Sequence, residues 1–200
     1  MPMRRYNNGL YIGISAGPSI PVQSIDNAYN TGYMINVPIG WDSPFSPLGF
    51  RVDLGYTRLG ARNTFRTGPT FIVDGQPQTA ALATNSAQIW SALANAKLRL
   101  PFLGHFGGGA TSGIYAIGGV GVNTFRNYNT TFALTNPEFN DNGTISSNRE
   151  TLTRFALDAG GGISWGLGNA EVFLESRYVT ALTANRRASY VPITLGVAFK

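Results

Sequence analysis

Apolar and polar residues alternate with a period of two along most of this chain. Over residues 191–200 the odd positions read Val, Ile, Leu, Val and Phe, while the even positions read Pro, Thr, Gly, Ala and Lys. Residues 33–42 and 50–57 follow a similar rule. Successive side chains of a β-strand point to opposite faces, so this period indicates strands with one apolar face.

Applied to the whole chain, the pattern predicts about eight strands. The glycine-rich run 118–121 gives little side-chain signal, so the facing of the fifth strand stays open, as does that of the first. Residues 80–96 are rich in alanine and have helix propensity, but their second half is interpreted as strand because apolar and polar positions alternate there up to Arg99. The expected strands cover residues 10–20, 32–42, 48–59, 88–100, 113–125, 151–165, 170–183 and 189–200.

The connections differ in length in an ordered way. Segments 43–47 and 166–169 are short and contain the turn formers Pro, Gly and Asn, whereas 60–87 and 126–150 are long, polar and rich in Asn and Thr. Bacterial outer-membrane barrels combine short periplasmic turns with longer external loops. We therefore expect an all-β fold, a closed antiparallel up-and-down transmembrane β-barrel of about eight strands.

Two sets of side chains indicate that the apolar face meets lipid and the other face lines the lumen. An eight-stranded lumen is just wide enough for side chains, so charges inside it must pair. Asp158 and Arg177 are expected partners on neighbouring strands. The predicted lumen charges are Arg51, Asp53, Lys97, Arg99, Arg154, Asp158, Glu175 and Arg177. Aromatic residues on the apolar face fall near strand ends, as in interfacial girdles, and comprise Tyr33, Trp41, Phe50, Tyr56, Trp90, Phe155, Trp165, Tyr178 and Phe199.

Four segments carry a resemblance to a known family. They read YIGISAGPSI (11–20), FRVDLGYTRL (50–59), IYAIGGVGVN (114–123) and YVPITLGVAFK (190–200). In these the chain resembles the small outer-membrane barrel family typified by the OmpA transmembrane domain and OmpX. The last segment is similar to the terminal assembly signal of that family, except that Lys200 follows Phe199. The resemblance implies an eight-stranded barrel in a bacterial outer membrane.

Composition narrows the class of protein. Only 12% of the 200 residues are charged, 25 are Gly and none is Cys, so disulfides cannot brace the fold. The net charge is +5, but the basic residues are dispersed, which argues against nucleic acid as a partner. Residues 1–8 lack the apolar stretch of a signal peptide, so the export signal is expected to have been removed. They are interpreted as a periplasmic tail or a remnant foreign to the mature protein, before a single barrel domain over 9–200.

Motifs for catalysis, cofactors or metals are weak, and the chain is expected not to be an enzyme. His105 is the only histidine, and there is no G-x-S-x-G. One His without Cys argues against a transition-metal site, and no cofactor is expected. The glycine runs 107–109 and 160–162 lack phosphate-loop spacing. The acids Glu138, Asp141 and Glu150 lack the spacing of a calcium loop and suit a polar external loop better.

The expected function is structural or surface-interacting. If the lumen is closed and filled with charge, binding is expected at the external loops 60–87 and 126–150. The expected partners are outer-membrane lipids around the barrel and a protein or surface at these loops. A narrow channel or transporter is the alternative, in which the lumen charges line a gated path. A soluble lipocalin-like binder and a lipid-A-modifying enzyme are more distant alternatives.

Overall fold

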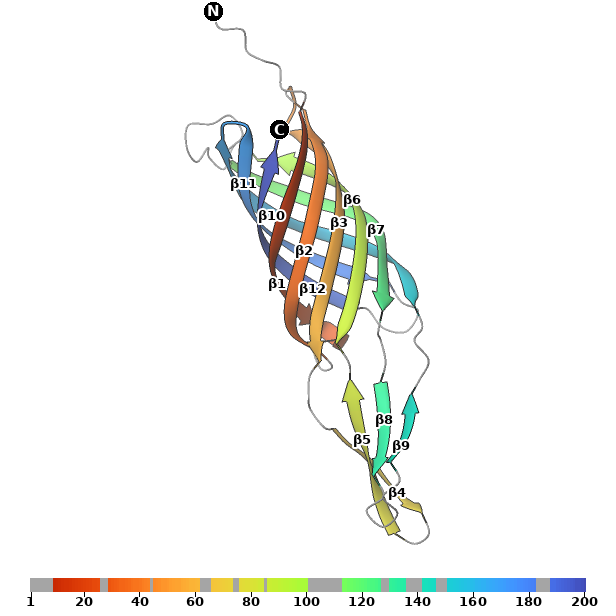
Figure 1. Cartoon of the computed structure of the whole chain (residues 1–200). Coiled ribbons are helices and arrows are strands. Elements are labelled where there is room, and N and C mark those ends of the chain that lie inside the picture. The colour runs from red at the N-terminus through yellow and green to blue at the C-terminus, as the bar shows by residue number, and fades with distance from the viewer. Residues whose placement is uncertain are drawn as a thin grey trace, which may run out of the picture.

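Eight long antiparallel strands close into a barrel, which confirms the predicted fold class (Figure 1). The computed structural model describes residues 9–25, 29–43, 45–61, 66–73, 76–84, 86–100, 113–126, 130–135, 142–146, 151–182 and 188–200. The barrel strands are β1 (Leu10–Val22), β2 (Tyr29–Asp42), β3 (Leu48–Ala61), β6 (Ala87–Arg99), β7 (Gly113–Arg126), β10 (Leu152–Leu167), β11 (Ala170–Ala181) and β12 (Ala188–Phe199).

The barrel has up-and-down topology. Each barrel strand pairs with the next one along the chain, and β1 also pairs with β12 to close the cylinder. β1 begins and β12 ends at the end of the barrel that carries the connections 43–47 and 168–169, here called the short-turn end. The opposite, long-connection end carries segments 62–86 and 127–151 and the 3-10 turn η1 (Gln23–Ile25).

A second, smaller sheet was missed by the sequence pattern. It contains β4 (Arg66–Val73), β5 (Gln76–Thr84), β8 (Thr130–Thr135) and β9 (Asn142–Ser146), in the order β4-β5-β8-β9. The two segments expected to be loops, 60–87 and 126–150, each contribute a pair of strands, which join through β5 and β8. These strands are short and mix Thr and Ala with few large apolar residues, so alternation could not reveal them. Figure 1 shows this sheet beyond the long-connection end of the barrel.

The structure settles the facing of the two ambiguous strands. In β1, Leu10 and Ile12 are exposed whereas Tyr11 and Ser15 are buried in the lumen. In β7, Val120 is exposed, and the residues that alternate with it along the strand point into the lumen. The pairing of β7 with β6 continues without a break. Both strands therefore follow the same rule as the others.

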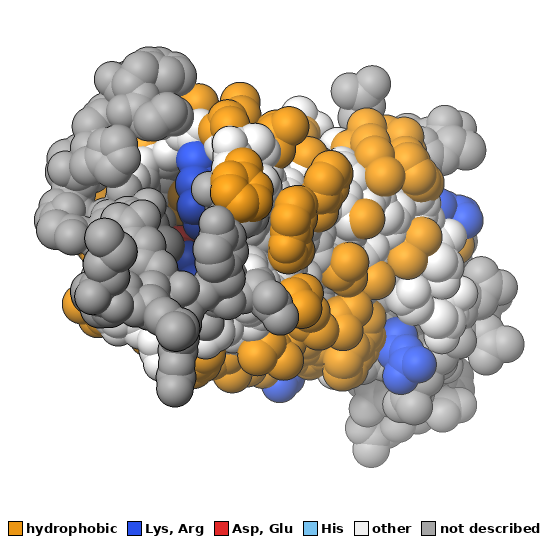
Figure 2. Space-filling model, turned by 90° about the horizontal axis from the view of Figure 1, so that it is seen from above, with side chains coloured by type: hydrophobic (Ala, Val, Ile, Leu, Met, Phe, Trp, Pro, Cys, Tyr) orange, Lys and Arg blue, Asp and Glu red, His pale blue; other side chains and the backbone are white. Residues whose placement is uncertain are grey.

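The outer wall of the barrel is apolar. Leu10 is 62% exposed and Leu195 is 60% exposed, and Leu, Ile, Val, Phe and Trp side chains surround them on the other strands. Figure 2 shows hydrophobic side chains gathered over the wall, with few charged ones among them. Exposed apolar area on this scale is typical of a surface that meets lipid. Among the described residues, no helix is long and apolar enough to cross a membrane.

Two glycines are required by local geometry. Leu167 pairs with Ala170, so Gly168 and Asn169 form a two-residue turn, and Gly168 has φ +67°, which favours glycine. Gly40 lies against the ring of Tyr11, where an added Cβ would come within 2.6 Å of the ring. The small residue therefore makes room for an inward tyrosine of the neighbouring strand.

Candidate functional site

The middle of the lumen contains a closed ring of four ion pairs. Arg51 binds Asp53 at 2.8 Å through Nε and Glu175 at 2.7 Å through Nη2. Arg177 completes the ring, with Nη1 3.2 Å from Asp53 and Nε 3.0 Å from Glu175. All four residues are at most 4% exposed. The ring therefore alternates positive and negative charge around a buried centre.

The ring joins opposite walls of the barrel. Arg51 and Asp53 lie on β3, and Glu175 and Arg177 lie on β11, with three strands between β3 and β11 on either side. Residues two apart on a strand share a face, so each strand presents one pair to the lumen. β3 presents Arg and then Asp, whereas β11 presents Glu and then Arg, and opposite charges meet across the lumen.

Further polar groups complete this ring to form the central network. Asp158 on β10 accepts a hydrogen bond from Arg177 at 3.1 Å. The Tyr115 hydroxyl donates to Glu175 at 2.7 Å, and the amides of Asn36 and Asn95 donate to Asp53 at 2.6 and 2.7 Å. Burying charge is costly unless lone pairs and protons are satisfied, so these donors offset part of the cost of desolvating the ring.

A second set of charges, the mouth cluster, lies toward the short-turn end. It contains Asp42, Lys97, Arg99, Glu171 and Lys200. Lys97 lies 3.4 Å from Asp42 and 3.6 Å from Glu171, while Lys200 binds Glu171 at 2.6 Å and Arg99 binds Asp42.

Tyrosine rings and little open space separate the two networks. The Lys97 ammonium lies 4.7 Å from the ring centre of Tyr115 and 5.4 Å from that of Tyr11, within range for cation–π contact. The cavity here, bordered by Arg51 and Glu171, is about 10 Å³, the space of a single water at most. The two charged layers are therefore packed against each other.

The lumen toward the long-connection end is mainly apolar, in a region we call the apolar plug, although Thr57 and Asn123 are also buried there. It includes Leu59, Ile89, Leu93, Phe125, Val179 and Tyr190, each at most 4% exposed. Ile25 of η1 packs into the same cluster, so the turn after β1 covers this end of the lumen. The lumen was expected to be filled with charge; among the described residues the ion pairs lie in its middle and at the short-turn end, and the apolar plug occupies the long-connection end.

The structure distributes the eight predicted lumen charges unevenly. Five join the central network, whereas Lys97 and Arg99 belong to the mouth cluster. Arg154 joins neither network among the described contacts; it is half-buried and donates to the carbonyl of Thr153 at 3.2 Å. Sequence reasoning missed Asp42, Glu171 and Lys200, although each shares the inward parity of its strand.

The nine predicted interfacial aromatics all lie on the outer wall. Trp41 and Phe50 are paired across β2 and β3 at the short-turn end, where Trp165 and Phe199 also lie. Toward the other end, the ring of Tyr56 lies 6.3 Å from that of Tyr33 and 4.9 Å from that of Trp90. Phe155 and Tyr178 are exposed near the same end of their strands. The rings therefore form two levels.

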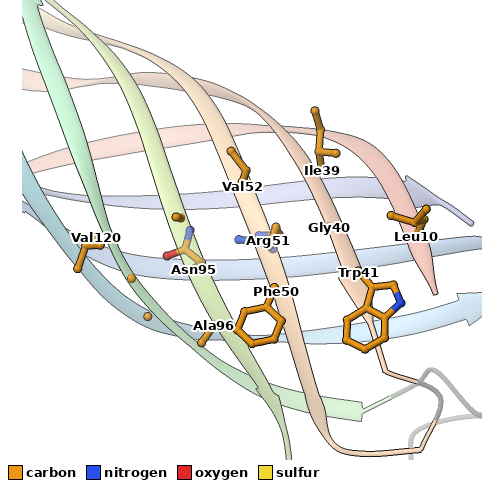
Figure 3. A pocket seen from close by; sticks show the side chains of 13 residues that line it. Leu10, Ile39, Gly40, Trp41, Phe50, Arg51, Val52, Asn95, Ala96 and Val120 are labelled. Carbon is orange, nitrogen blue, oxygen red and sulfur yellow. The ribbon is translucent and has the colours of Figure 1, made fainter.

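A shallow apolar groove crosses the outer wall over β2, β3, β6 and β7. It has a volume of about 550 Å³. Small residues, Ala94, Ala96 and Gly118, form its floor beside the larger Phe50 and Trp41. Figure 3 shows how Phe50, Trp41 and Val120 border it. The groove opens on the outer wall, and its lining also includes Arg51 and Asn95 of the central network.

The remaining candidates give no further site. His105, glycines 107–109 and the acids Glu138, Asp141 and Glu150 lie outside the described residues. Glycines 160–162 lie within β10, where an added Cβ on Gly162 would come within 2.6 Å of the Tyr115 hydroxyl. Within the described ranges no three metal-ligating side chains come together.

Solved structures share this fold. Neisserial surface protein A superposes with a TM-score of 0.52 at 15% identity, covering 96% of this chain and 97% of that chain. Ail, the attachment invasion locus protein of Yersinia pestis, gives 0.52 at 13% identity, covering 96% and 99%. No family model matches the chain, and no curated protein matches it in sequence. At these identities the likeness shows the fold, which is that of small outer-membrane barrels.

Proposed function

We propose that the chain is an integral protein of a bacterial outer membrane, in which a closed barrel anchors an external interaction surface. The observation that carries this is the lumen, which is obstructed at successive levels by the mouth cluster, the central network and the apolar plug. The wall around it is apolar, as lipid contact requires. Such a barrel serves better as an anchor than as a pore.

The external role is supported by the long connections. Segments 60–87 and 126–150 leave the barrel at one end and share a four-stranded sheet, so they form a joint structure outside the membrane. Binding residues often lie on segments that a rigid scaffold positions. Ail, a solved barrel of this fold, is an attachment invasion locus protein, which is a role of the same kind. A protein or surface partner is proposed for this region, and lipids for the wall.

The proposal assigns no catalytic activity to the chain. Each carboxylate in the part of the chain that the structure describes is paired with Lys or Arg inside the lumen. Charges that neutralise one another are suited to bracing the barrel rather than to proton transfer.

Two measurements test the proposal. Electrophoresis with and without boiling should show a mobility shift after refolding in detergent, and planar bilayers should show no steady conductance. Arg177→Ala should also remain closed, because the apolar plug still blocks the lumen. Steady conductance of the parent would instead favour the channel alternative, and solubility in plain buffer without a mobility shift would favour a soluble binder.

The orientation is tested separately on intact cells. A protease added outside should cut within 60–87 or 126–150 and leave the barrel strands intact. Cleavage confined to the connection 43–47 would reverse the proposed orientation.

A further inference from the structure

The barrel separates its charges by sign between lumen and exterior. Every Asp and Glu that the structure describes lies in the lumen, and their side chains are at most 7% exposed. By contrast, Arg58 at the end of β3 and Arg126 at the end of β7 are exposed on the outer wall. Around the described outer wall, the exposed charge is therefore positive and unneutralised.

The two arginines lie in one row across three strands. Arg58 pairs with Gln88 on β6, and Gln88 pairs with Arg126 on β7. Directly paired residues share a face, and neighbouring strands are about 4.8 Å apart, so the two backbones are about 10 Å apart with Gln88 between them. Arginine side chains starting from these positions can converge on one group above Gln88.

An aromatic shelf lies directly beneath this row. Tyr56 lies two residues before Arg58 on β3, and Trp90 lies two residues after Gln88 on β6. Tyr56 and Trp90 are paired across the strands, and their rings are in contact. Two residues of strand span about 7 Å. Tyr and Trp mark the headgroup level of a membrane, so the arginine row is placed among the headgroups at the long-connection end.

The row is local to this wall. Where other strands approach the same end, the exposed side chains among the described residues are uncharged, either apolar as at Ile20 and Leu182 or neutral polar as at Thr153. At the short-turn end no exposed side chain among the described residues is charged, and the large exposed ones include Phe45, Leu48 and Leu167. If the exposed arginines served only a general attraction of the barrel to an anionic membrane, they would not need to be confined to β3, β6 and β7.

We propose that Arg58, Gln88 and Arg126 bind the phosphate of an anionic lipid in the external leaflet, with Tyr56 and Trp90 beneath its headgroup. The inference rests on the proposed function, which puts this end of the barrel at the outer face of the membrane. Guanidinium groups match phosphate oxygens with paired donors, and the Gln88 amide adds a neutral donor. The Nη2 atom of Arg58 lies 3.5 Å from the Ser86 hydroxyl, a contact that leaves its other donors for the ligand.

The occupant is a lipid rather than a soluble anion because of where the row opens. It faces outward, next to the aromatic shelf and in line with the apolar wall, and a lipid can contact all three at once. A soluble phosphate could use only the arginines.

Tryptophan fluorescence offers a direct test, since the chain has three tryptophans and one lies in the shelf. A Trp41→Phe, Trp165→Phe background leaves Trp90 as the reporter, in the refolded full chain. Phosphatidylcholine vesicles receive small amounts of either phosphatidylglycerol or phosphatidylcholine carrying the same brominated acyl chains. The phosphatidylglycerol should associate more strongly at Trp90, on the order of tenfold, because each basic side chain near the surface contributes about fivefold.

Matched variants assign the preference to the row. Arg58→Gln with Arg126→Gln should bring the ratio close to one, and either single change should remove part of it. Arg154→Gln, at the same end but half-buried, should leave the ratio unchanged. A reporter retaining only Trp41, at the other end, should show no preference, and inorganic phosphate should compete weakly.

The possible failures are distinguishable. A ratio near one in the parent, or an equal ratio in the double variant, would overturn the lipid site while leaving the anchored barrel intact. Full competition by inorganic phosphate would overturn the assignment to a lipid. A chain that gives no heat-dependent mobility shift has not formed the barrel in the membrane, and this would overturn the proposed function and the site with it.

Discussion

The two halves of the lumen are built from the same strands but by different chemistry. On β6, Ile89 and Leu93 belong to the apolar plug, whereas Asn95 and Lys97, on the same inward face, belong to the charged layers. A residue that faces the lumen can therefore be either polar or apolar. One half is packed like the interior of a soluble protein, and the other is braced by paired charges.

This difference determines how each half should respond to mutation. In the ionic half, the loss of one group leaves its partners buried and unpaired. In the apolar half, the loss of a side chain leaves a cavity but no charge. The outer wall provides a third environment, in which lipid can fill the space.

The largest expected effect is at Arg177, which binds Asp53, Asp158 and Glu175. Arg177→Ala should lower the free energy of unfolding by about 3–5 kcal/mol, because it leaves Asp53 and Glu175 with Arg51 alone and removes the ion pair of Asp158. Urea-induced unfolding from lipid vesicles measures the change.

A double-mutant cycle that combines Asp158→Ala with Arg177→Ala measures the coupling between these two residues. The double variant should lose less than the two single losses added together. Strict additivity would show that the pair at 3.1 Å contributes no coupling.

In the apolar plug, Leu93→Ala should cost about 2–5 kcal/mol, with little dependence on salt. Leu195→Ala on the outer wall is the control and should cost clearly less, because lipid tails are as apolar as the removed side chain. Equal losses at the two positions would mean that the plug is not packed like a core.

A charged side chain introduced on the outer wall should destabilise the barrel, even at a position where shortening the side chain costs little. Leu195→Arg should lower stability in bilayers by about 2–4 kcal/mol. Thr194→Arg points into the lumen and should instead depend on space and on the nearby Glu175, its partner on β11. A Leu195→Arg barrel as stable as the parent would contradict the assignment of this face to lipid.

The smallest effect is expected in the mouth cluster at Arg99, whose side chain is 27% exposed. Arg99→Ala should cost about 0.5–1 kcal/mol or less, since solvent screens the pair and Lys97 still neutralises Asp42. Unfolding at low and high salt checks this, and a loss as large as that of Arg177→Ala would place Arg99 in the buried network.

Alternation located the strands, because a slip of one residue would turn every apolar side chain inward, and the ordered connection lengths then predicted the barrel. It also placed Arg51, Asp53, Glu175 and Arg177 on inward faces. It could not show which of them meet, since β3 and β11 are far apart in sequence and their relative height depends on the register of the strands between them.

The features that escaped prediction have physical reasons. The plug was missed because Ile89, Leu93 and Val179 alternate with outward residues that include Trp90, Ala92 and Tyr178, so the pattern shows little contrast there. Asp42, Glu171 and Lys200 lie close to strand ends, where charge is ordinarily a sign of solvent. The four-stranded sheet arises from pairing between two connections, a contact that no local pattern encodes.

The ring of four ion pairs also bears on how long the folded barrel lasts. Arg51 and Glu175 are 124 residues apart, and their strands face each other only when the cylinder is closed. Stabilisation that arises after the transition state acts on the rate of unfolding and leaves the rate of folding almost unchanged. The ring should therefore slow unfolding specifically: without Arg177 the barrel would insert at the parental rate, yet unfold on the order of a hundredfold to a few thousandfold faster.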